Sequence, residues 1–303
     1  MASISYVGDV ELLGNAFLKR NYNQINKCIK EKKENLSCSV EHEGEIYGCE
    51  IRENIPLTQL YGFRVRVVDF VFSKIENLYN EEQDEQLEKL FQLLCERVKH
   101  EKAYYTFRIP TQIMGVLIKY NSFFKSAFLC GGIVTYITAK GAGKSNREEK
   151  TNIYIADDSY IKKYGNKLLR ISAETFDNYQ GQYHLSPVTS KKAGLIYKDW
   201  LKRSFSSNVE KIFVVTYKSN PVGFATVRET DTIVEAILGG ISNEYRELGA
   251  YTNLIRNMVN YTNQKGKAFI IGTQFENLIV QGTWSHFGLK PFNSFYNFHL
   301  DAR

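Results

Sequence analysis

The feature that most constrains the fold is the alternation of short β-branched runs with amphipathic stretches in the second half of the chain. The runs Lys211–Lys218, Thr232–Ser242 and Ala268–Gln274 have the length of strands and are rich in Val, Ile and Thr. The segment Ser219–Gly223 combines Ser, Asn, Pro and Gly, which is typical of a hairpin turn. The order predicted here is a helix, three antiparallel strands, a helix, a strand, a helix and a strand.

The predicted elements can be placed along the whole chain. Those of the first half are a helix at Val10–Lys32, strands at Glu45–Glu53 and Phe63–Ile75, a helix at Glu81–Glu101, a strand at Ala103–Pro110, a helix at Gln112–Asn121 and a strand at Gly132–Ala139. Those of the second half are strands at Asn152–Asp158, Lys211–Lys218, Gly223–Glu229, Thr232–Ser242, Ala268–Gln274 and Phe292–Leu300, with helices at Ser190–Ser204, Ala250–Lys265 and Leu278–Gly288. The clearest amphipathic helix is Glu81–Glu101, in which Leu and Phe recur at helical spacing.

A polar, glycine-bearing segment, Lys140–Lys150, is the best candidate for a boundary or an exposed hairpin. It predicts two domains, residues 1–145 and residues 146–303. The same segment contains Gly143-Lys144-Ser145, which resembles the end of a phosphate-binding P-loop. That motif needs a glycine where this chain has Thr138, so the sequence does not predict a nucleoside triphosphate site.

Bulk composition excludes several classes of protein. The 303 residues carry a net charge of +6, and the five cysteines form no CxxC pair. No Cys/His cluster has the spacing of a zinc site, so no metal is expected. The first residues do not resemble a signal peptide, and no apolar run is long enough to span a bilayer. We therefore expect a cytoplasmic protein that binds no membrane; no basic-aromatic motif predicts nucleic-acid binding.

The loop Arg246–Tyr251 lies between the predicted strand Thr232–Ser242 and the helix that follows. Free N–H groups at the start of a helix can bind a pyrophosphate, and the helix dipole favours the anion. Gly249 permits the close backbone approach that such a site needs, and Arg246 adds a cation. The alternative is a plain cap between strand and helix, and the loop alone does not decide between the two.

The order of elements, together with a few spaced residues, resembles the GNAT superfamily of N-acyltransferases. The resemblance covers about 186–300, and the residues that carry it are Arg246, Gly249, Asn277, Trp284 and Gly288. Within the superfamily, the segment 273–300 is similar to the TDP-fucosamine acetyltransferase group, which acylates amino groups of nucleotide-linked sugars. Leu60–Phe70 is similar to the first domain of that group. The resemblance implies an α/β (α+β) fold of two GNAT-like domains, each with a mixed, mostly antiparallel sheet flanked by helices, the C-terminal domain being complete.

The resemblance also implies a division of labour. The first domain would bind the acceptor, and the second would bind acyl-coenzyme A and catalyse attack of an amine on the thioester. The residues expected to contact the acyl-CoA are Ile241, Arg246, Leu248, Gly249, Ala250, Tyr251 and Asn277. For Asn277, capping of the following helix is an equal alternative. The backbone expected to stabilise the oxyanion is that of Leu238, Gly239 and Gly240, where two glycines would let the strand bulge.

Two positions differ from the usual pattern of the superfamily. The last loop residue is commonly small, and here it is Tyr251. The position of the tyrosine that often protonates the departing thiolate is taken by Trp284, and an indole cannot supply a proton at useful acidity. The sequence therefore leaves the proton donor unassigned, and Trp284 is expected to pack rather than react.

The acceptor is expected to be a dTDP-linked amino sugar used for bacterial surface polysaccharide, and the aromatic side chains are the expected contacts. The residues expected to bind it are Tyr197, Trp200, Tyr217, Tyr296 and His299, with core packing as the alternative for each. The candidates for a general base are Glu235, His184, Tyr296 and His299. Another amine acceptor and a non-catalytic acyl-CoA-binding module remain open, as do the acyl chain and a homodimer.

Overall fold

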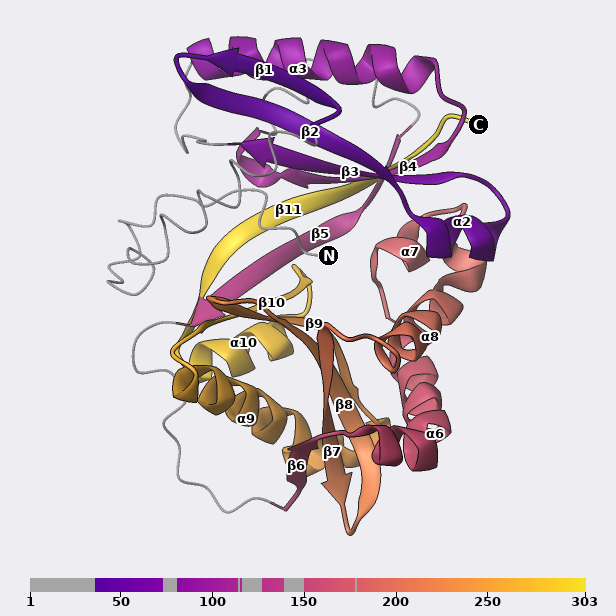
Figure 1. The fold of residues 1–303 in the computed structure, drawn as a ribbon, viewed down its shortest axis with the longest axis vertical. Coiled ribbons are helices and arrows are strands. Elements are labelled where there is room, and N and C mark those ends of the chain that lie inside the picture. Colours follow the sequence, from indigo (N-terminus) through magenta and orange to yellow (C-terminus); the bar gives the residue numbers. More distant parts are fainter. Residues whose placement is uncertain (1–35, 73–80, 114, 116–126, 139–149, 178) are drawn as a thin grey trace. The chain divides into compact units, whose positions relative to one another are not determined.

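The computed structural model describes residues 36–72, 81–113, 115, 127–138, 150–177 and 179–303. The chain packs as two compact units (Figure 1). One is Thr135–Phe292, called here the 135–292 unit. The other, the terminal unit, combines Ala2–Val134 with the segment Asn293–Arg303. The roles predicted for 1–145 and 146–303 stay predictions.

The terminal unit contains a sheet in the order β1-β2-β3-β4-β11. Its elements are β1 (Cys38–His42), β2 (Glu45–Glu53), α2 (Ile55–Tyr61), β3 (Val65–Phe72), α3 (Glu81–Lys99), β4 (Tyr104–Pro110), η3 (Thr111–Ile113), the first part of β5 (Ala127–Thr138) and most of β11 (Leu289–Asp301). The β3–β4 pair is parallel, whereas β1–β2, β2–β3 and β4–β11 are antiparallel.

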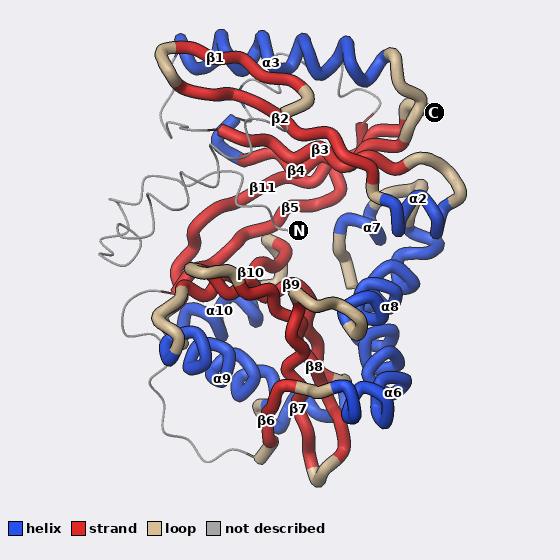
Figure 2. The backbone as a smooth tube through the Cα atoms, viewed as in Figure 1, coloured by secondary structure: helices blue, strands red, loops and turns tan. Residues whose placement is uncertain are grey.

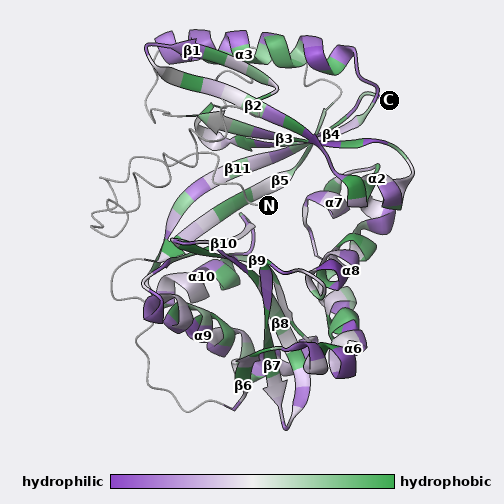
Figure 3. Cartoon of the chain, viewed as in Figure 1, coloured by the Kyte–Doolittle hydropathy of each residue, from purple (hydrophilic) through white to green (hydrophobic). Residues whose placement is uncertain are grey.

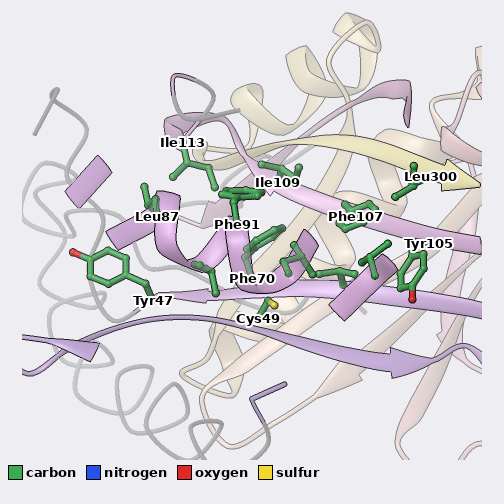
Figure 4. Packing of buried hydrophobic residues seen from close by; sticks show 14 of the residues in the cluster. Tyr47, Cys49, Phe70, Leu87, Phe91, Tyr105, Phe107, Ile109, Ile113 and Leu300 are labelled. Carbon is green, nitrogen blue, oxygen red and sulfur yellow. The ribbon is translucent and has the colours of Figure 1, made fainter. Parts of the chain in front are cut away.

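Helix α3 covers this sheet with an apolar face, as its sequence predicts (Figure 3). Leu87, Leu90, Phe91 and Leu94 are all 0% exposed. Phe91 meets Phe70 of β3 with ring centroids 5.5 Å apart, in the middle of the packed cluster of Figure 4. Burial of this face, rather than helix propensity, stabilises α3.

The 135–292 unit contains strands in the order β5-β10-β9-β8-β7-β6, with only the last part of β5 belonging to it (Figure 2). Its elements are β6 (Asn152–Ile155), α6 (Asp158–Phe176), α7 (Gln182–Leu185), η4 (Ser190–Lys192), α8 (Ala193–Ser204), β7 (Glu210–Tyr217), β8 (Asn220–Glu229), β9 (Ile233–Ile241), η5 (Asn243–Leu248), α9 (Ala250–Gln264), β10 (Ala268–Gln274) and α10 (Leu278–His286). Helices α6 and α8 lie on one side of β7–β9, and α9 and α10 lie on the other (Figure 1). The predicted class, a mixed α/β fold with mostly antiparallel sheets, is confirmed.

Helix α6 was not expected from the sequence. Asp157 caps it, accepting a hydrogen bond from the backbone N–H of Tyr160 at 2.7 Å. Leu168, Ile171 and Phe176 form its buried face. The spacing of these three apolar residues and the aspartate before them were the available signals. Polar residues at most other positions obscured the pattern.

The hairpin turn between β7 and β8 lies earlier than predicted. Tyr217 pairs with Asn220, so the turn is the dipeptide Lys218-Ser219 rather than Ser219–Gly223. Both turn residues have positive φ, 46° and 65°. A two-residue turn of this kind matches the twist of the strands, but the residues that usually mark it are Asn and Gly. The predicted helices at 10–32 and most of 112–121 fall outside the described residues, as does nearly all of 140–150.

His299 on β11 belongs to the core of the terminal unit. Its side chain is 0% exposed, and its Nδ1 lies 2.8 Å from the Tyr104 hydroxyl. Burial lowers the pKa of the imidazole from 6.5 to about 3, so the ring is neutral at neutral pH.

This burial predicts a specific acid sensitivity. Between pH 6.5 and pH 3, His299 is protonated in the unfolded chain but stays neutral in the folded chain. The free energy of unfolding therefore decreases as the pH falls through this range. When the pH is lowered from 7 to 4, the free energy of unfolding should decrease less in His299→Gln than in wild type. The expected difference between the two decreases is about 2–4 kcal/mol. Urea denaturation followed by circular dichroism measures this difference. His286→Gln, at an exposed position of α10, is the control and should keep the wild-type pH dependence; identical profiles for all three proteins would contradict the prediction.

Candidate active site

Strands β9 and β10 part after a short parallel contact. Their pairing runs from Ile233 with Ala268 to Glu235 with Ile270. Beyond that point β9 continues to its end at Ile241 without pairing to β10 in the described register. One edge of β9 is therefore open, at the carboxyl end of a parallel pair. Ligands bind at such positions in sheets where neighbouring strands diverge.

A bulge in β9 accompanies this divergence. Thr226 of β8 pairs with Leu238, but the next residue, Val227, pairs with Ala236, so Ile237 is an extra residue in β9. A bulge bends its strand and increases the local twist. The bend directs the end of β9 away from β10. The extra residue precedes Gly239 and Gly240, which themselves pair with Ala225 and Phe224 in the regular register.

Backbone alternation shows which groups face the open edge. The Ser242 N–H donates to a carbonyl of β8 at 2.8 Å. Counting back from Ser242, Gly240 and Leu238 also direct their N–H and C=O groups toward β8. Gly239 and Ile241 direct theirs the other way. Of the predicted oxyanion residues, Gly239 is therefore the one whose N–H faces the open edge.

Gly240 is required for the approach of α6 to β9. A Cβ at this position would lie 2.5 Å from Cγ2 of Thr175. The Thr175 hydroxyl in turn lies 3.5 Å from the carbonyl oxygen of Ile241, to which it donates. Thr175 was not among the predicted site residues, because α6 was not predicted.

The predicted loop forms a turn of 3₁₀ helix, η5, followed directly by α9. Gly249 joins the two with φ 71°, a left-handed conformation that favours glycine. No side chain caps α9 at Gly249, so the N–H groups at its start keep no intrahelical partner. Arg246 is exposed, and no carboxylate pairs with it among the residues described. The loop thus offers backbone donors, a helix dipole and a cation to an anion.

Tyr217 lies beside this loop. Its ring centroid is 5.9 Å from that of Tyr245 in η5, and the Lys218 ammonium lies over the Tyr217 ring at 5.3 Å. Tyr217, one of the aromatic residues predicted to bind acceptor, is thus in contact with η5, which leads into Gly249.

Tyr251 and Trp284, the two departures from the superfamily pattern, are in contact. Trp284 on α10 is 1% exposed, and its Nε1–H donates to the Tyr251 hydroxyl at 2.9 Å. The Tyr136 ring packs edge-on against the indole at 5.3 Å. The side chain of Tyr251 therefore points toward α10, while its backbone N–H stays at the start of α9.

Polar side chains from the end of β10 extend this cluster. The Tyr179 hydroxyl donates to Oε1 of Gln274, and burial raises the pKa of Tyr179 to about 12. Asn277 donates to Oγ1 of Thr273 at 3.0 Å. Asn277 occupies the cap position of α10 but makes no capping bond, so its side chain does not act as the N-cap. Tyr179, one of 20 tyrosines in the chain, carried no sequence signal.

Of the other predicted acceptor residues, two lie on α8 and two belong to the terminal unit. Tyr197 on α8 is buried and stacks on Phe176 at 4.6 Å, as core packing requires. Trp200, also on α8, is half-buried. Tyr296 and His299 belong to the terminal unit. Their roles in binding stay predictions.

Two candidates for a general base lie in the 135–292 unit. Glu235 is half-buried on β9, where the strand parts from β10. His184 on α7 stacks against Tyr197 with centroids 5.7 Å apart, and burial lowers the pKa of its imidazole. Glu235 alone is placed by backbone geometry at the opening.

Two further features belong to the terminal unit. Potential ligand atoms of His42, Glu43 and Glu82 lie within 4.8 Å of one another, and His42 already bonds to Glu82. A hollow of about 950 Å³ beside α3 is lined in part by Cys38, Arg97 and Glu101. No residue of the predicted site lines the hollow or joins the cluster.

Comparison with known proteins relates the fold to solved structures. No protein-family model and no curated protein matches the chain. A conserved protein of unknown function from Staphylococcus epidermidis ATCC 12228 has a TM-score of 0.54 at 13% identity, covering 91% of this chain and 98% of that one. A GCN5-related N-acetyltransferase from Sphaerobacter thermophilus has a TM-score of 0.54 at 8% identity, covering 92% and 86%. Another, from Kribbella flavida, has a TM-score of 0.51 at 8% identity, covering 91% and 95%.

These likenesses establish the fold. Over most of its length, the chain shares the fold of these two N-acetyltransferase structures.

The conformation of Gly249 can be tested by adding a methyl group. A Cβ at this position would meet nothing within 4 Å, so the cost of Gly249→Ala is in the backbone. Positive φ costs an L-residue about 1–2 kcal/mol, and we expect that loss of stability. Urea denaturation followed by tryptophan fluorescence measures it, since both tryptophans lie in this unit.

Gly282→Ala is the matched control. Gly282 lies within α10, and its Cβ would also meet nothing within 4 Å. Alanine should stabilise this position by about 0.5–1 kcal/mol, because glycine is a poor helix former. If both substitutions change the free energy of unfolding equally, Gly249 does not have the left-handed backbone conformation.

Proposed function

We propose that this chain transfers an acyl group from acyl-coenzyme A to a primary amine. The observation that carries the proposal is the meeting of three features in one unit: the parting of β9 and β10, the bulge at Ile237, and the uncapped start of α9 after Gly249. Each alone has a structural explanation. Together they provide an open strand edge that leads to an anion-binding helix end.

The proposed donor would lie along this edge. The coenzyme A pyrophosphate would accept hydrogen bonds from the N–H groups at the start of α9, with Arg246 as the nearby cation. The backbone groups of Gly239 and Ile241 would meet the pantetheine and the thioester. An N–H at Gly239 would stabilise the oxyanion formed by amine attack, and one such donor typically contributes about 10²–10³ in rate.

For the acceptor we propose the amino group of a dTDP-linked amino-deoxy sugar, made for bacterial surface polysaccharide. This finer proposal is supported by the sequence resemblance of 273–300 and Leu60–Phe70. Tyr217, whose ring contacts Tyr245 of η5, is the proposed aromatic contact for the acceptor. Glu235 is the proposed base that accepts the ammonium proton before attack. Other amines, such as peptides and polyamines, are the second candidate class.

No described helix combines the length and apolarity needed to cross a membrane. A cytoplasmic location, where acyl-CoA is made, is part of the proposal.

Replacement of Arg246 tests the donor site. We expect Arg246→Ala to weaken acetyl-CoA binding about tenfold, the loss of one exposed charge-assisted contact. Acetyl-pantetheine, which lacks the pyrophosphate, should bind both proteins equally. Isothermal titration calorimetry gives the four dissociation constants.

Arg203→Ala is the control, because it removes the same charge from an exposed arginine of α8 that pairs with Asp199 at 2.9 Å. It should bind acetyl-CoA like wild type. If both variants weaken binding equally, or if Arg246→Ala weakens both ligands equally, the loop does not bind the pyrophosphate.

A panel of amines tests the acceptor class. We expect loss of thioester absorbance from acetyl-CoA in the presence of dTDP-amino sugars, with the acylated sugar identified by mass. Turnover with peptides or polyamines alone would instead support the second class. An acyl-CoA present at 100 times its Kd should raise the free energy of unfolding by about 2.7 kcal/mol. If no acyl-CoA raises the melting temperature, the acyltransferase function is wrong.

A further inference from the structure

The proton needed by the departing thiolate has no donor in the pattern read from the sequence, because Trp284 stands where a tyrosine is usual. The structure brings a phenol to that same place from another helix. The Tyr251 oxygen accepts the Trp284 Nε1–H at 2.9 Å. Since an indole nitrogen only donates, the Tyr251 O–H is left to donate elsewhere. No acceptor for it is found among the described residues.

The contact is held firmly from the α10 side. Trp284 is 1% exposed and packs against Tyr136, whose hydroxyl donates to Oε1 of Gln281 at 3.2 Å. Gln281 donates in turn to the carbonyl of Phe275 at 2.8 Å. The indole N–H is therefore fixed, and it fixes the phenolic oxygen.

Tyr251 also belongs to the helix that begins at the proposed donor site. It is the second residue of α9, so its backbone is part of the proposed pyrophosphate site while its side chain extends toward α10. The residue as a whole is partly exposed, while its phenol group is buried beside Trp284. Burial raises the pKa of the phenol, and the nearby Tyr179 adds to this, so the group is protonated before reaction.

We propose that Tyr251 is the general acid of the transfer and that Trp284 positions it, an inference that rests on the acyltransferase function proposed above. The neutral amine nitrogen bonds to the thioester carbonyl carbon, and the C–S bond breaks. The sulfur leaves with the electron pair and takes the proton of the Tyr251 hydroxyl, giving free thiol. The phenolate, stabilised by the indole N–H, recovers a proton that the attacking nitrogen loses through water.

The alternative is that Tyr251 only satisfies a buried indole, because a buried Trp N–H usually finds an acceptor. The two roles differ in what a double variant does. Tyr251→Phe leaves the indole N–H without its acceptor and lowers the melting temperature under either role. Adding Trp284→Phe removes the stranded donor and should restore much of the stability, since losing both partners is nearly neutral.

The experiment compares wild type, Tyr251→Phe, Trp284→Phe and the double variant. For each, it measures the melting temperature, kcat and KM with acetyl-CoA and the best amine of the panel. We expect Tyr251→Phe to lose about 10²-fold in kcat with KM nearly unchanged. The double variant should regain stability but not kcat. Trp284→Phe should keep at least about a tenth of kcat/KM, the effect of one hydrogen bond.

Tyr261→Phe is the matched control on the same helix. Its hydroxyl bonds to Lys211 and Glu229, both at 2.7 Å, and takes no part in the proposed site. It should keep wild-type kcat.

Three outcomes would overturn the role of Tyr251 without touching the proposed function. They are recovery of kcat in the double variant, a wild-type kcat in Tyr251→Phe, and equal losses of kcat and acetyl-CoA affinity. A wild-type protein that neither binds nor consumes any acyl-CoA would overturn the acyltransferase function, and the role of Tyr251 with it.

Discussion

The candidate site depends on one constraint, the short length of the parallel contact between β9 and β10. A sheet that paired fully here would satisfy every backbone group of β9 and leave nothing for a ligand. The extra residue Ile237 bends β9 away after Glu235, and the opposite edge stays paired to β8. The same chain segment is thus a stable strand on its β8 side, while its other side has no pairing to β10 after Glu235. The start of α9 then lies beyond the end of that edge, because only the short 3₁₀ helix η5 separates the helix from β9.

Elements with a strong local pattern could be predicted from the sequence. β2 and β10 have the predicted bounds, and the four predicted apolar residues of α3 are all buried. Elements whose signals are weak or unusual could not. Helix α6 has a short apolar stripe among many polar residues, and the β7–β8 turn uses Lys and Ser in conformations that other residues adopt more readily. Tertiary packing and strand register, rather than local preference, decide both cases.

The same distinction holds within the site. The loop from Arg246 to Tyr251 was recognisable because glycine, a cation and a helix start are adjacent in sequence. The contact between Tyr251 and Trp284 joins residues 33 positions apart on two helices, and neither residue type indicates the other. Thr175 and Tyr179 follow from α6 and were missed with it. In the sequence, Tyr251 and Trp284 are two separate departures from the superfamily pattern. In the fold they are the two partners of one hydrogen bond.

The division of the chain has a consequence for the order of folding. β11 supplies seven residues that pair with β4, and these residues are made only after the whole 135–292 unit. During synthesis, one edge of β4 therefore stays unpaired while the residues of the 135–292 unit are being made. Unpaired strand edges are templates for association with other chains. The terminal unit therefore keeps an unpaired strand edge, and is vulnerable to misassembly, until Asn293–Arg303 has been made.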